Sequence, residues 1–138
     1  SLFDAMYKHN VMLEGTILKA SMVLSGKSCP DQADADEVAD ATVRCLKNTV
    51  PASLPGIVFL SGGQSDRAAT EHLNLMNTLG GLPWPLSFSY GRAMQSAALQ
   101  LWSQDLVGNF AAAQKIVALR ARENGLAALG RWTPDLAG

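Results

Sequence analysis

The stretch Val11-Met12-Leu13-Glu14-Gly15-Thr16-Ile17-Leu18-Lys19 decides how this chain folds. It is short, largely apolar and partly β-branched, which predicts a buried strand over residues 11–18 with Lys19 at its carboxyl end. Lysine is almost never fully buried unless it is paired. A lysine held in a water-poor pocket loses its proton more easily, and the neutral amine is then a nucleophile. The alternative is a strand-end lysine that points into solvent.

Two further apolar segments end in a similar way. Gly56-Ile57-Val58-Phe59-Leu60 breaks into Ser61-Gly62-Gly63-Gln64-Ser65, and Leu86-Ser87-Phe88-Ser89-Tyr90 breaks into Gly91-Arg92-Ala93. We expect strands near 56–61 and 86–90, each followed by a helical pattern. Repetition of strand, loop and helix is typical of parallel βα units. In barrels of this class the carboxyl ends of the strands carry the active site.

The connections between these strands carry helix signals. Asp34 and Glu37 have the spacing of a capping box. Ser65 is expected to cap the helix after the second strand, which Gly80-Gly81 then ends. Inward-facing apolar positions are expected along the helices, and they include Cys45, Leu79, Ala97 and Trp102. Other helices are expected at the beginning and end of the chain: residues 1–9, after Arg92, and from Asn109 to Gly130.

Loops rich in glycine and polar residues after the last two strands predict a phosphate site. Glycines let backbone N–H groups approach phosphate oxygens, and the following helix adds a favourable dipole. A serine hydroxyl and an arginine guanidinium would add further hydrogen bonds. The expected phosphate ligands are Ser61, Gly62, Ser89, Gly91 and Arg92. The alternatives are glycines that only serve a turn and an arginine that pairs with a carboxylate.

Composition and charge indicate which classes of partner the protein is expected to lack. With 11 basic and 12 acidic residues the net charge is −1, which argues against nucleic acid as a partner held by bulk electrostatics. No apolar run reaches the roughly 18 residues of a membrane span. Two cysteines, Cys29 and Cys45, fit a reduced, cytoplasmic protein. They have no companions at metal-ligand spacing, so we expect no metal site. We also expect no cofactor. His9 and His72 are given no role.

Three motifs together resemble those of a known family. Leu13–Lys19, Phe59–Ser65 and Phe88–Ala93 are similar, in order and spacing, to the last three strand-end motifs of class I fructose-bisphosphate aldolase. The resemblance implies an α/β fold, the C-terminal portion of a TIM (β/α)8 barrel, with residues 1–138 forming the last three βα units and the C-terminal helices. A closed barrel needs roughly 250 residues, so the N-terminal strands are expected to be absent from this chain.

The resemblance also implies a carbon–carbon lyase of glycolysis and gluconeogenesis. Such an enzyme cleaves fructose 1,6-bisphosphate reversibly to dihydroxyacetone phosphate and glyceraldehyde 3-phosphate through a Schiff base, which would form on Lys19. Phosphorylated ketoses and trioses are therefore the implied substrates. The family's acid–base carboxylates are expected on the absent strands. Two departures are Ala20-Ser21, where the family commonly has proline followed by asparagine or serine, and the lack of a tyrosine-ended tail.

Other interpretations stay open at this stage. A partial barrel could be a noncatalytic phosphate-binding or assembly module that dimerises to cover its open face. A transaldolase-like Schiff-base enzyme fits the three motifs less well. Open strand edges invite association, which fits such an assembly module. The intact enzyme is also expected to be a homo-oligomer. Strict alternation would place Glu14 toward the helix layer, as a structural partner rather than a catalytic acid, unless a bulge intervenes.

Overall fold

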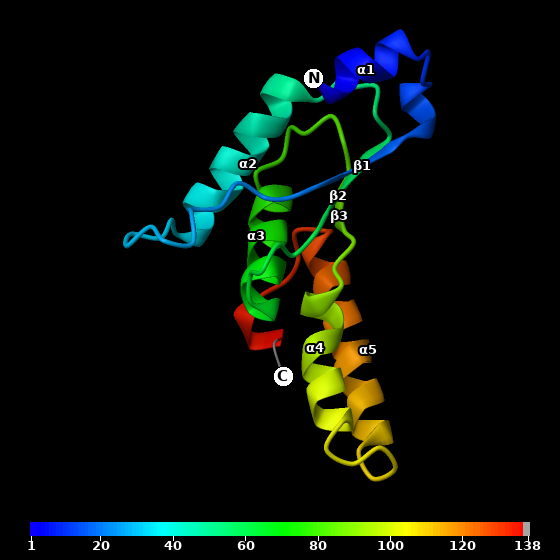
Figure 1. The fold of residues 1–138 in the computed structure, drawn as a ribbon. Coiled ribbons are helices and arrows are strands. Elements are labelled where there is room, and N and C mark those ends of the chain that lie inside the picture. The colour runs from blue at the N-terminus through cyan, green and yellow to red at the C-terminus, as the bar shows by residue number, and fades with distance from the viewer. Residues whose placement is uncertain (137–138) are drawn as a thin grey trace.

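A three-stranded parallel sheet organises the computed structural model, which describes residues 1–136 (Figure 1). The strands lie in the order β1 (Ile17–Ala20), β2 (Gly56–Phe59) and β3 (Leu86–Phe88). Both pairings are parallel, and their register places Lys19 beside Val58 and Val58 beside Ser87. The parallel βα arrangement predicted from the sequence is confirmed.

Helices follow and cover the strands. Figure 1 shows α4 and α5 lying side by side and leading away from the sheet. Within residues 1–136 no helix combines the length and the apolar character that crossing a membrane would require. The helices are α1 (Leu2–Lys8), α2 (Ala35–Thr49), α3 (Asp66–Thr78), α4 (Arg92–Trp102) and α5 (Phe110–Ala127), with two short 3-10 turns, η1 (Leu13–Gly15) and η2 (Pro134–Leu136).

The first strand begins later than the sequence predicts. Residues 13–15 form a 3-10 turn, in which the backbone N–H of Thr16 donates to the carbonyl of Leu13 at 3.0 Å. Side chains alternate only along an extended backbone, so the alternation expected around Glu14 does not apply. Leu13 is buried in the core, whereas Glu14 and Ile17 are exposed. The prediction that Glu14 faces the helix layer is therefore wrong.

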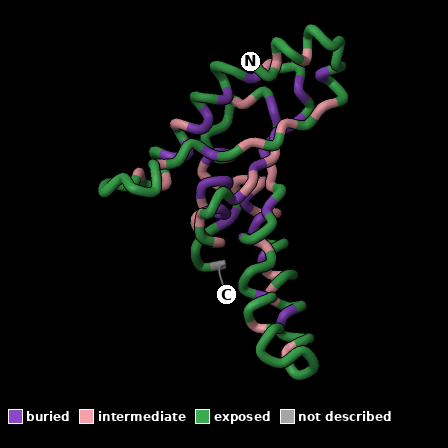
Figure 2. The backbone as a smooth tube through the Cα atoms, in the orientation of Figure 1, coloured by how far each residue is buried: buried purple, intermediate pink, exposed green. Residues whose placement is uncertain are grey.

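The sheet buries one face and leaves the other open. Ile57 and Phe59 are 0% exposed and belong to the same buried cluster as Leu73 of α3. On the opposite face Ile17 is 62% exposed, and Lys19 is exposed as well. Figure 2 shows the buried residues concentrated around the sheet and α3, with the far end of the α4–α5 pair largely exposed.

The predicted helix boundaries rest on observed caps. The Asp34 carboxylate accepts from the backbone N–H of Glu37 at 2.9 Å, and the Glu37 carboxylate accepts from the N–H of Asp34 at 3.2 Å. Ser65 caps α3 by accepting from the N–H of Ala68 at 3.1 Å. The α3 helix ends before Gly80-Gly81, where φ values of 67° and 62° favour glycine.

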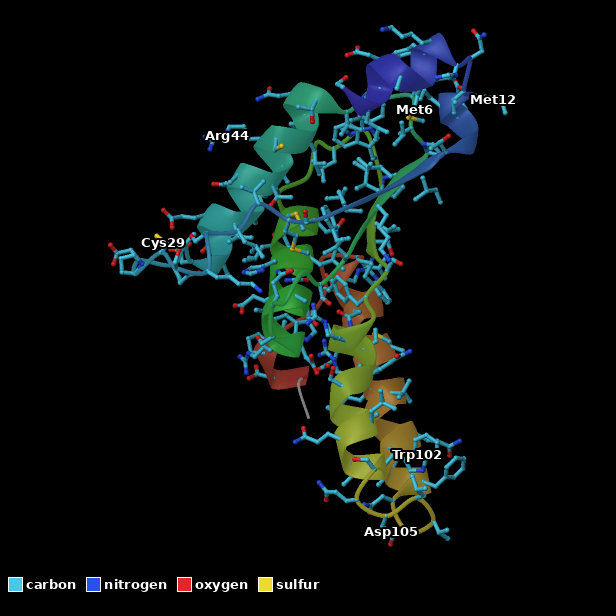
Figure 3. All side chains as sticks on the ribbon, in the orientation of Figure 1. Met6, Met12, Cys29, Arg44, Trp102 and Asp105 are labelled. Carbon is cyan, nitrogen blue, oxygen red and sulfur yellow. The ribbon has the colours of Figure 1, made fainter. Side chains whose placement is uncertain are left out.

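Several apolar helix positions predicted to face the core are exposed instead. In α2 the buried face includes Thr42, whose hydroxyl accepts from the backbone N–H of Val23 at 2.9 Å, whereas Cys45 is exposed. Trp102 is exposed because α4 ends away from the sheet (Figure 3). The incorrectly predicted positions are Cys45, Leu79, Ala97 and Trp102.

A buried arginine that sequence analysis left without a role joins three helices. Arg120 of α5 donates to the carbonyl of Ala93 in α4 at 3.1 Å and to the carbonyl of Asp66 in α3 at 2.7 Å. It also donates to the hydroxyl of Thr70 at 2.7 Å and pairs with the buried carboxylate of Glu123. Removing one partner of a buried ion pair leaves an uncompensated charge. This network therefore holds the α4–α5 pair to α3.

We predict that Arg120→Ala strongly destabilises the intact protein, because it leaves Glu123 buried without its cation. The expected loss in the free energy of unfolding is about 3–5 kcal/mol, measured by urea denaturation. The matched control is Arg122→Ala on the exposed face of the same helix, which should change stability by less than about 0.5 kcal/mol. Equal stability of the two variants would contradict the role given to the network.

Candidate functional site

The carboxyl edge of the sheet brings Lys19 and Ser89 together. Lys19 lies on the open face of β1, and its Nζ donates to the hydroxyl of Ser89 at 3.1 Å. Ser89 directly follows β3, and its backbone N–H donates to the carbonyl of Phe59 in β2 at 2.8 Å. That bond continues the sheet by one residue and fixes the start of the loop. The amine of one strand end and the hydroxyl of another therefore meet across the middle strand.

Within residues 1–136, neither Lys19 nor Arg92 forms an ion pair with a carboxylate. The ion pairs of the described part join Ser1 to Asp4 and Arg120 to Glu123. Arg92 is exposed and is the first residue of α4. The alternative of an arginine paired with a carboxylate therefore has no support in this part of the chain. The Arg92 guanidinium is therefore available to an anionic ligand at the sheet edge that also carries Lys19.

The backbone conformation of the turn after β2 accounts for its two glycines. Ser61 is buried, and its carbonyl accepts from the backbone N–H of Gln64 at 2.7 Å. Gly62 and Gly63 have φ values of 49° and 89°, in the left-handed region that favours glycine. The turn alone accounts for both glycines, so phosphate binding at Ser61 and Gly62 stays a prediction.

Gly91 is a different case, because no turn geometry requires it. It is the N-cap of α4 with φ −92°, and it makes no side-chain cap hydrogen bond. A Cβ placed at Gly91 would meet no atom within 4 Å. The start of α4 therefore faces open space beside Arg92, and helix starts with free N–H groups attract anions. These features fit the predicted phosphate role of Gly91 and Arg92 without testing it.

The described cavities do not lie at Lys19. Of the three cavities described in residues 1–136, none is lined by Lys19, Ser61 or Arg92. A single cavity shared by these three residues stays a prediction. In the same part of the chain no three His, Cys, Asp or Glu side chains gather in a way that could hold a metal ion.

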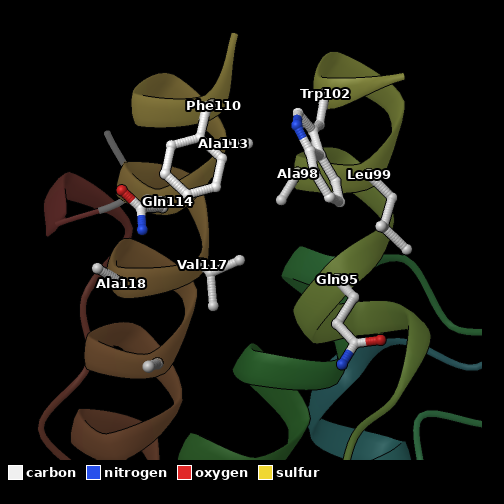
Figure 4. Close-up of a pocket in the computed structure, with 10 residues that line it drawn as sticks. Gln95, Ala98, Leu99, Trp102, Phe110, Ala113, Gln114, Val117 and Ala118 are labelled. Atoms are coloured by element: carbon white, nitrogen blue, oxygen red, sulfur yellow. The ribbon is translucent and has the colours of Figure 1, made fainter. Parts of the chain in front are cut away.

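The largest described cavity is an apolar groove of about 620 Å³ between α4 and α5 (Figure 4). Trp102 and Phe110 face each other across it with ring centroids 6.3 Å apart. Leu99, Ala113 and Val117 line the groove below them. The groove offers no ionisable group among its lining residues, so it is unsuited to the chemistry predicted for the sheet edge.

Gln64 and His72 form a contact that sequence analysis missed. The amide Nε2 of Gln64 lies 2.6 Å from Nδ1 of His72 in α3 and donates to Sδ of Met22 at 3.2 Å. Burial lowers the pKa of His72, while the neighbouring Glu71 carboxylate acts in the opposite direction. No local motif predicts these contacts, because Met22 is remote from Gln64 and His72 in the sequence. A cavity of about 220 Å³ lies beside it, lined in part by Gly62, Gly63 and Lys27.

The parallel sheet and its lysine-bearing edge define a part of a β/α-barrel protein, and comparison identifies the family. A family model described as class I fructose-bisphosphate aldolase matches residues 1–138. The chain belongs to the class I fructose-bisphosphate aldolase family. It is 70% identical over 132 residues to a probable class 1 fructose-bisphosphate aldolase from Xanthomonas axonopodis, covering 96% of this chain and 40% of the relative.

More distant relatives agree. Fructose-bisphosphate aldolase B of Sparus aurata is 50% identical over 136 residues, covering 98% of this chain and 37% of that protein. The solved structure of fructose-bisphosphate aldolase from Plasmodium falciparum superposes with a TM-score of 0.91 at 44% identity, covering 96% of this chain and 38% of that one. The chain thus spans about 40% of the length of its curated relatives, and its fold matches part of an aldolase barrel.

We predict that His72 makes the stability of the intact protein fall as the pH drops below its unfolded pKa of about 6.5. Because burial lowers the folded pKa, the unfolded chain binds the proton first, so stability rises with pH up to that value. Unfolding free energies at pH 5.5 and 7.5 should differ less in His72→Asn than in the wild type. His9→Asn, at an exposed position, should keep the wild-type difference; an unchanged difference in His72→Asn would argue against this assignment.

Proposed function

We propose that the intact protein containing this chain is a Schiff-base aldolase that cleaves fructose 1,6-bisphosphate reversibly to dihydroxyacetone phosphate and glyceraldehyde 3-phosphate. The observation that carries the proposal is the position of Lys19. Its amine lies at the carboxyl edge of a parallel sheet, hydrogen-bonded to Ser89, in a chain of this family. Barrel enzymes place their reacting groups at this edge. Glycolysis and gluconeogenesis in the cytoplasm, and assembly into a homo-oligomer, belong to the same proposal.

The amine of Lys19 would act as the electron sink. It adds to the C2 carbonyl of the ketose in its uncharged form, and the resulting carbinolamine takes up a proton and loses water to give an iminium ion. A base takes the proton of the C4 hydroxyl, the C3–C4 bond breaks, and its electron pair moves into the iminium to give an enamine. The aldehyde leaves, a proton is added at C3, and water hydrolyses the iminium to release the second triose phosphate. We expect the base among the residues of the relatives that this chain does not span.

The loops after β2 and β3 would hold the substrate phosphates. Ser61 and Gly62 supply a hydroxyl and a backbone N–H group from one loop. Ser89, Gly91 and Arg92 supply a hydroxyl, the open start of α4 and an unpaired guanidinium from the other. Charge-assisted hydrogen bonds from such groups are strong and directional. Phosphate anchoring places C2 within reach of Lys19, which is worth a large part of the rate.

We predict that Lys19→Ala lowers kcat/KM for fructose 1,6-bisphosphate by at least about a thousandfold, because no other group would replace the nucleophile. Affinity for inorganic phosphate should change by less than about threefold, since alanine leaves both phosphate loops in place. Lys47→Ala, at an exposed position of α2, is the matched control and should retain activity. Substantial cleavage by Lys19→Ala would point to another nucleophile, and a wild-type protein without activity would favour the noncatalytic module.

We predict that Arg92→Ala lowers kcat/KM by roughly ten- to a hundredfold on a substrate whose phosphate Arg92 binds, as expected for a hydrogen bond to a charged group. The measurement compares fructose 1,6-bisphosphate with fructose 1-phosphate. Loss on the bisphosphate alone places Arg92 at the C6 phosphate, and equal loss places it at C1. Arg44→Ala, on the exposed face of α2, controls for charge. No loss on either substrate would refute phosphate binding by Arg92.

A further inference from the structure

Gln64 connects three segments beside the predicted phosphate turn. Its backbone N–H closes the turn by donating to the carbonyl of Ser61 at 2.7 Å. Its side-chain amide contacts Nδ1 of His72 at 2.6 Å and Sδ of Met22 at 3.2 Å. His72 belongs to α3, whereas Met22 lies in the loop three residues after Lys19. One side chain thus bridges the loop that follows Lys19 and the helix that follows the turn.

Both partners of this amide are buried. Met22 is buried, and His72 is 8% exposed. The remaining amide atom, Oε1 of Gln64, is buried without a hydrogen-bond partner. It lies 4.0 Å from the position that a Cβ at Gly62 would occupy. The amide therefore packs directly against the glycine turn while its nitrogen is anchored on two segments outside it.

The two glycines of the turn contribute no side-chain contacts of their own. Gly62 and Gly63 lack side chains, and both adopt left-handed φ values, so the unconstrained segment would sample many conformations. Backbone N–H groups bind an anion well only when they are already aimed at it, because ordering them on binding costs affinity. A tether on the next residue reduces that cost without touching the ligand.

We propose that Gln64 is a positioning residue, whose side-chain amide holds the Ser61-Gly62-Gly63 turn in the shape that receives a substrate phosphate, by anchoring it to His72 and Met22. The inference rests on the proposed function, since the substrate phosphate is the ligand of the turn. It predicts that the hydrogen bonds of Gln64, and not only its volume, set phosphate affinity. It also predicts a small effect on the bond-breaking step, because Gln64 contacts neither Lys19 nor Ser89 in the described structure.

Gln64→Met in the intact protein tests the inference, because methionine fills a similar volume without donating a hydrogen bond. Loss of a hydrogen bond of ordinary strength should raise Kd for inorganic phosphate, and KM for fructose 1,6-bisphosphate, by about three- to tenfold, with kcat within about threefold of the wild type. His72→Leu should produce a similar loss by removing the acceptor. The double variant should lose little more than Gln64→Met alone, because Gln64→Met already removes the contact with His72.

Gln100→Met is the matched control, since Gln100 is an exposed glutamine of α4, and it should bind phosphate as the wild type does. A second readout separates positioning from general damage. Borohydride trapping of dihydroxyacetone, which lacks a phosphate, should proceed at the wild-type rate in Gln64→Met, whereas trapping of dihydroxyacetone phosphate at subsaturating concentration should slow by the same three- to tenfold.

Three results would overturn the inference. They are an unchanged phosphate Kd in Gln64→Met, an equal loss with the phosphorylated and the unphosphorylated triose, and full additivity with His72→Leu. Should Gln64→Met not fold, unchanged phosphate affinity in His72→Leu decides against it. Failure of the proposed function has a different signature, namely no trapped adduct in the wild type while phosphate affinity still responds to Gln64. A wild-type protein without measurable phosphate affinity overturns both.

Discussion

Burial of one face of the parallel sheet is the constraint on which the rest of the structure depends. Ile57 and Phe59 are wholly buried on the helix side, so their neighbour Val58 must face the other way. Because Lys19 is paired with Val58 in register, it shares that open face. A slip of one residue would exchange the two faces and bury the lysine amine in an apolar core. The same burial that stabilises the sheet therefore presents Lys19 for chemistry.

Polar contacts fix the start and the packing of the helices that follow the strands. The caps at Asp34 and Ser65 define the starts of α2 and α3. Arg120 ties α3, α4 and α5 together through carbonyl and hydroxyl groups. The loops after β2 and β3 are consequently short segments between a hydrogen-bonded sheet and anchored helices. Such loops can present backbone N–H groups in a defined direction, which is what recognition of a phosphate requires.

Features carried by local sequence were predictable from the chain alone. The capping box at Asp34 and the helix end at Gly80 follow from nearby residues, and the structure agrees. The parallel strands follow from the repeated strand, loop and helix pattern, which the structure also confirms. The start of β1 was mispredicted because residues 13–15 fold into a 3-10 turn, and an apolar run gives no sign of such a turn. Apolar composition also could not show that Trp102 lies beyond the sheet.

Contacts between distant residues could not be predicted in this way. The Gln64–His72–Met22 contact and the Arg120 network depend on which helix packs on which loop, and no spacing rule encodes that. The candidate site was predicted only in outline. The structure adds the hydrogen bond between Lys19 and Ser89. The other phosphate ligands are still predicted from the sequence motifs alone. Lys19 is exposed in the described structure, and its position at the end of a strand, together with the motif, is what identified it.

The central claim, that Lys19 is the nucleophile of the site, is tested most directly by locating a trapped substrate in the sequence. The intact protein would be reduced with borohydride in the presence of dihydroxyacetone phosphate, digested with trypsin and analysed by mass spectrometry. An alkylated Lys19 resists trypsin, so the account predicts one labelled peptide, spanning residues 9–27, that carries the reduced triose phosphate. A label on Lys27 or on any other lysine, or no label at all, would contradict it.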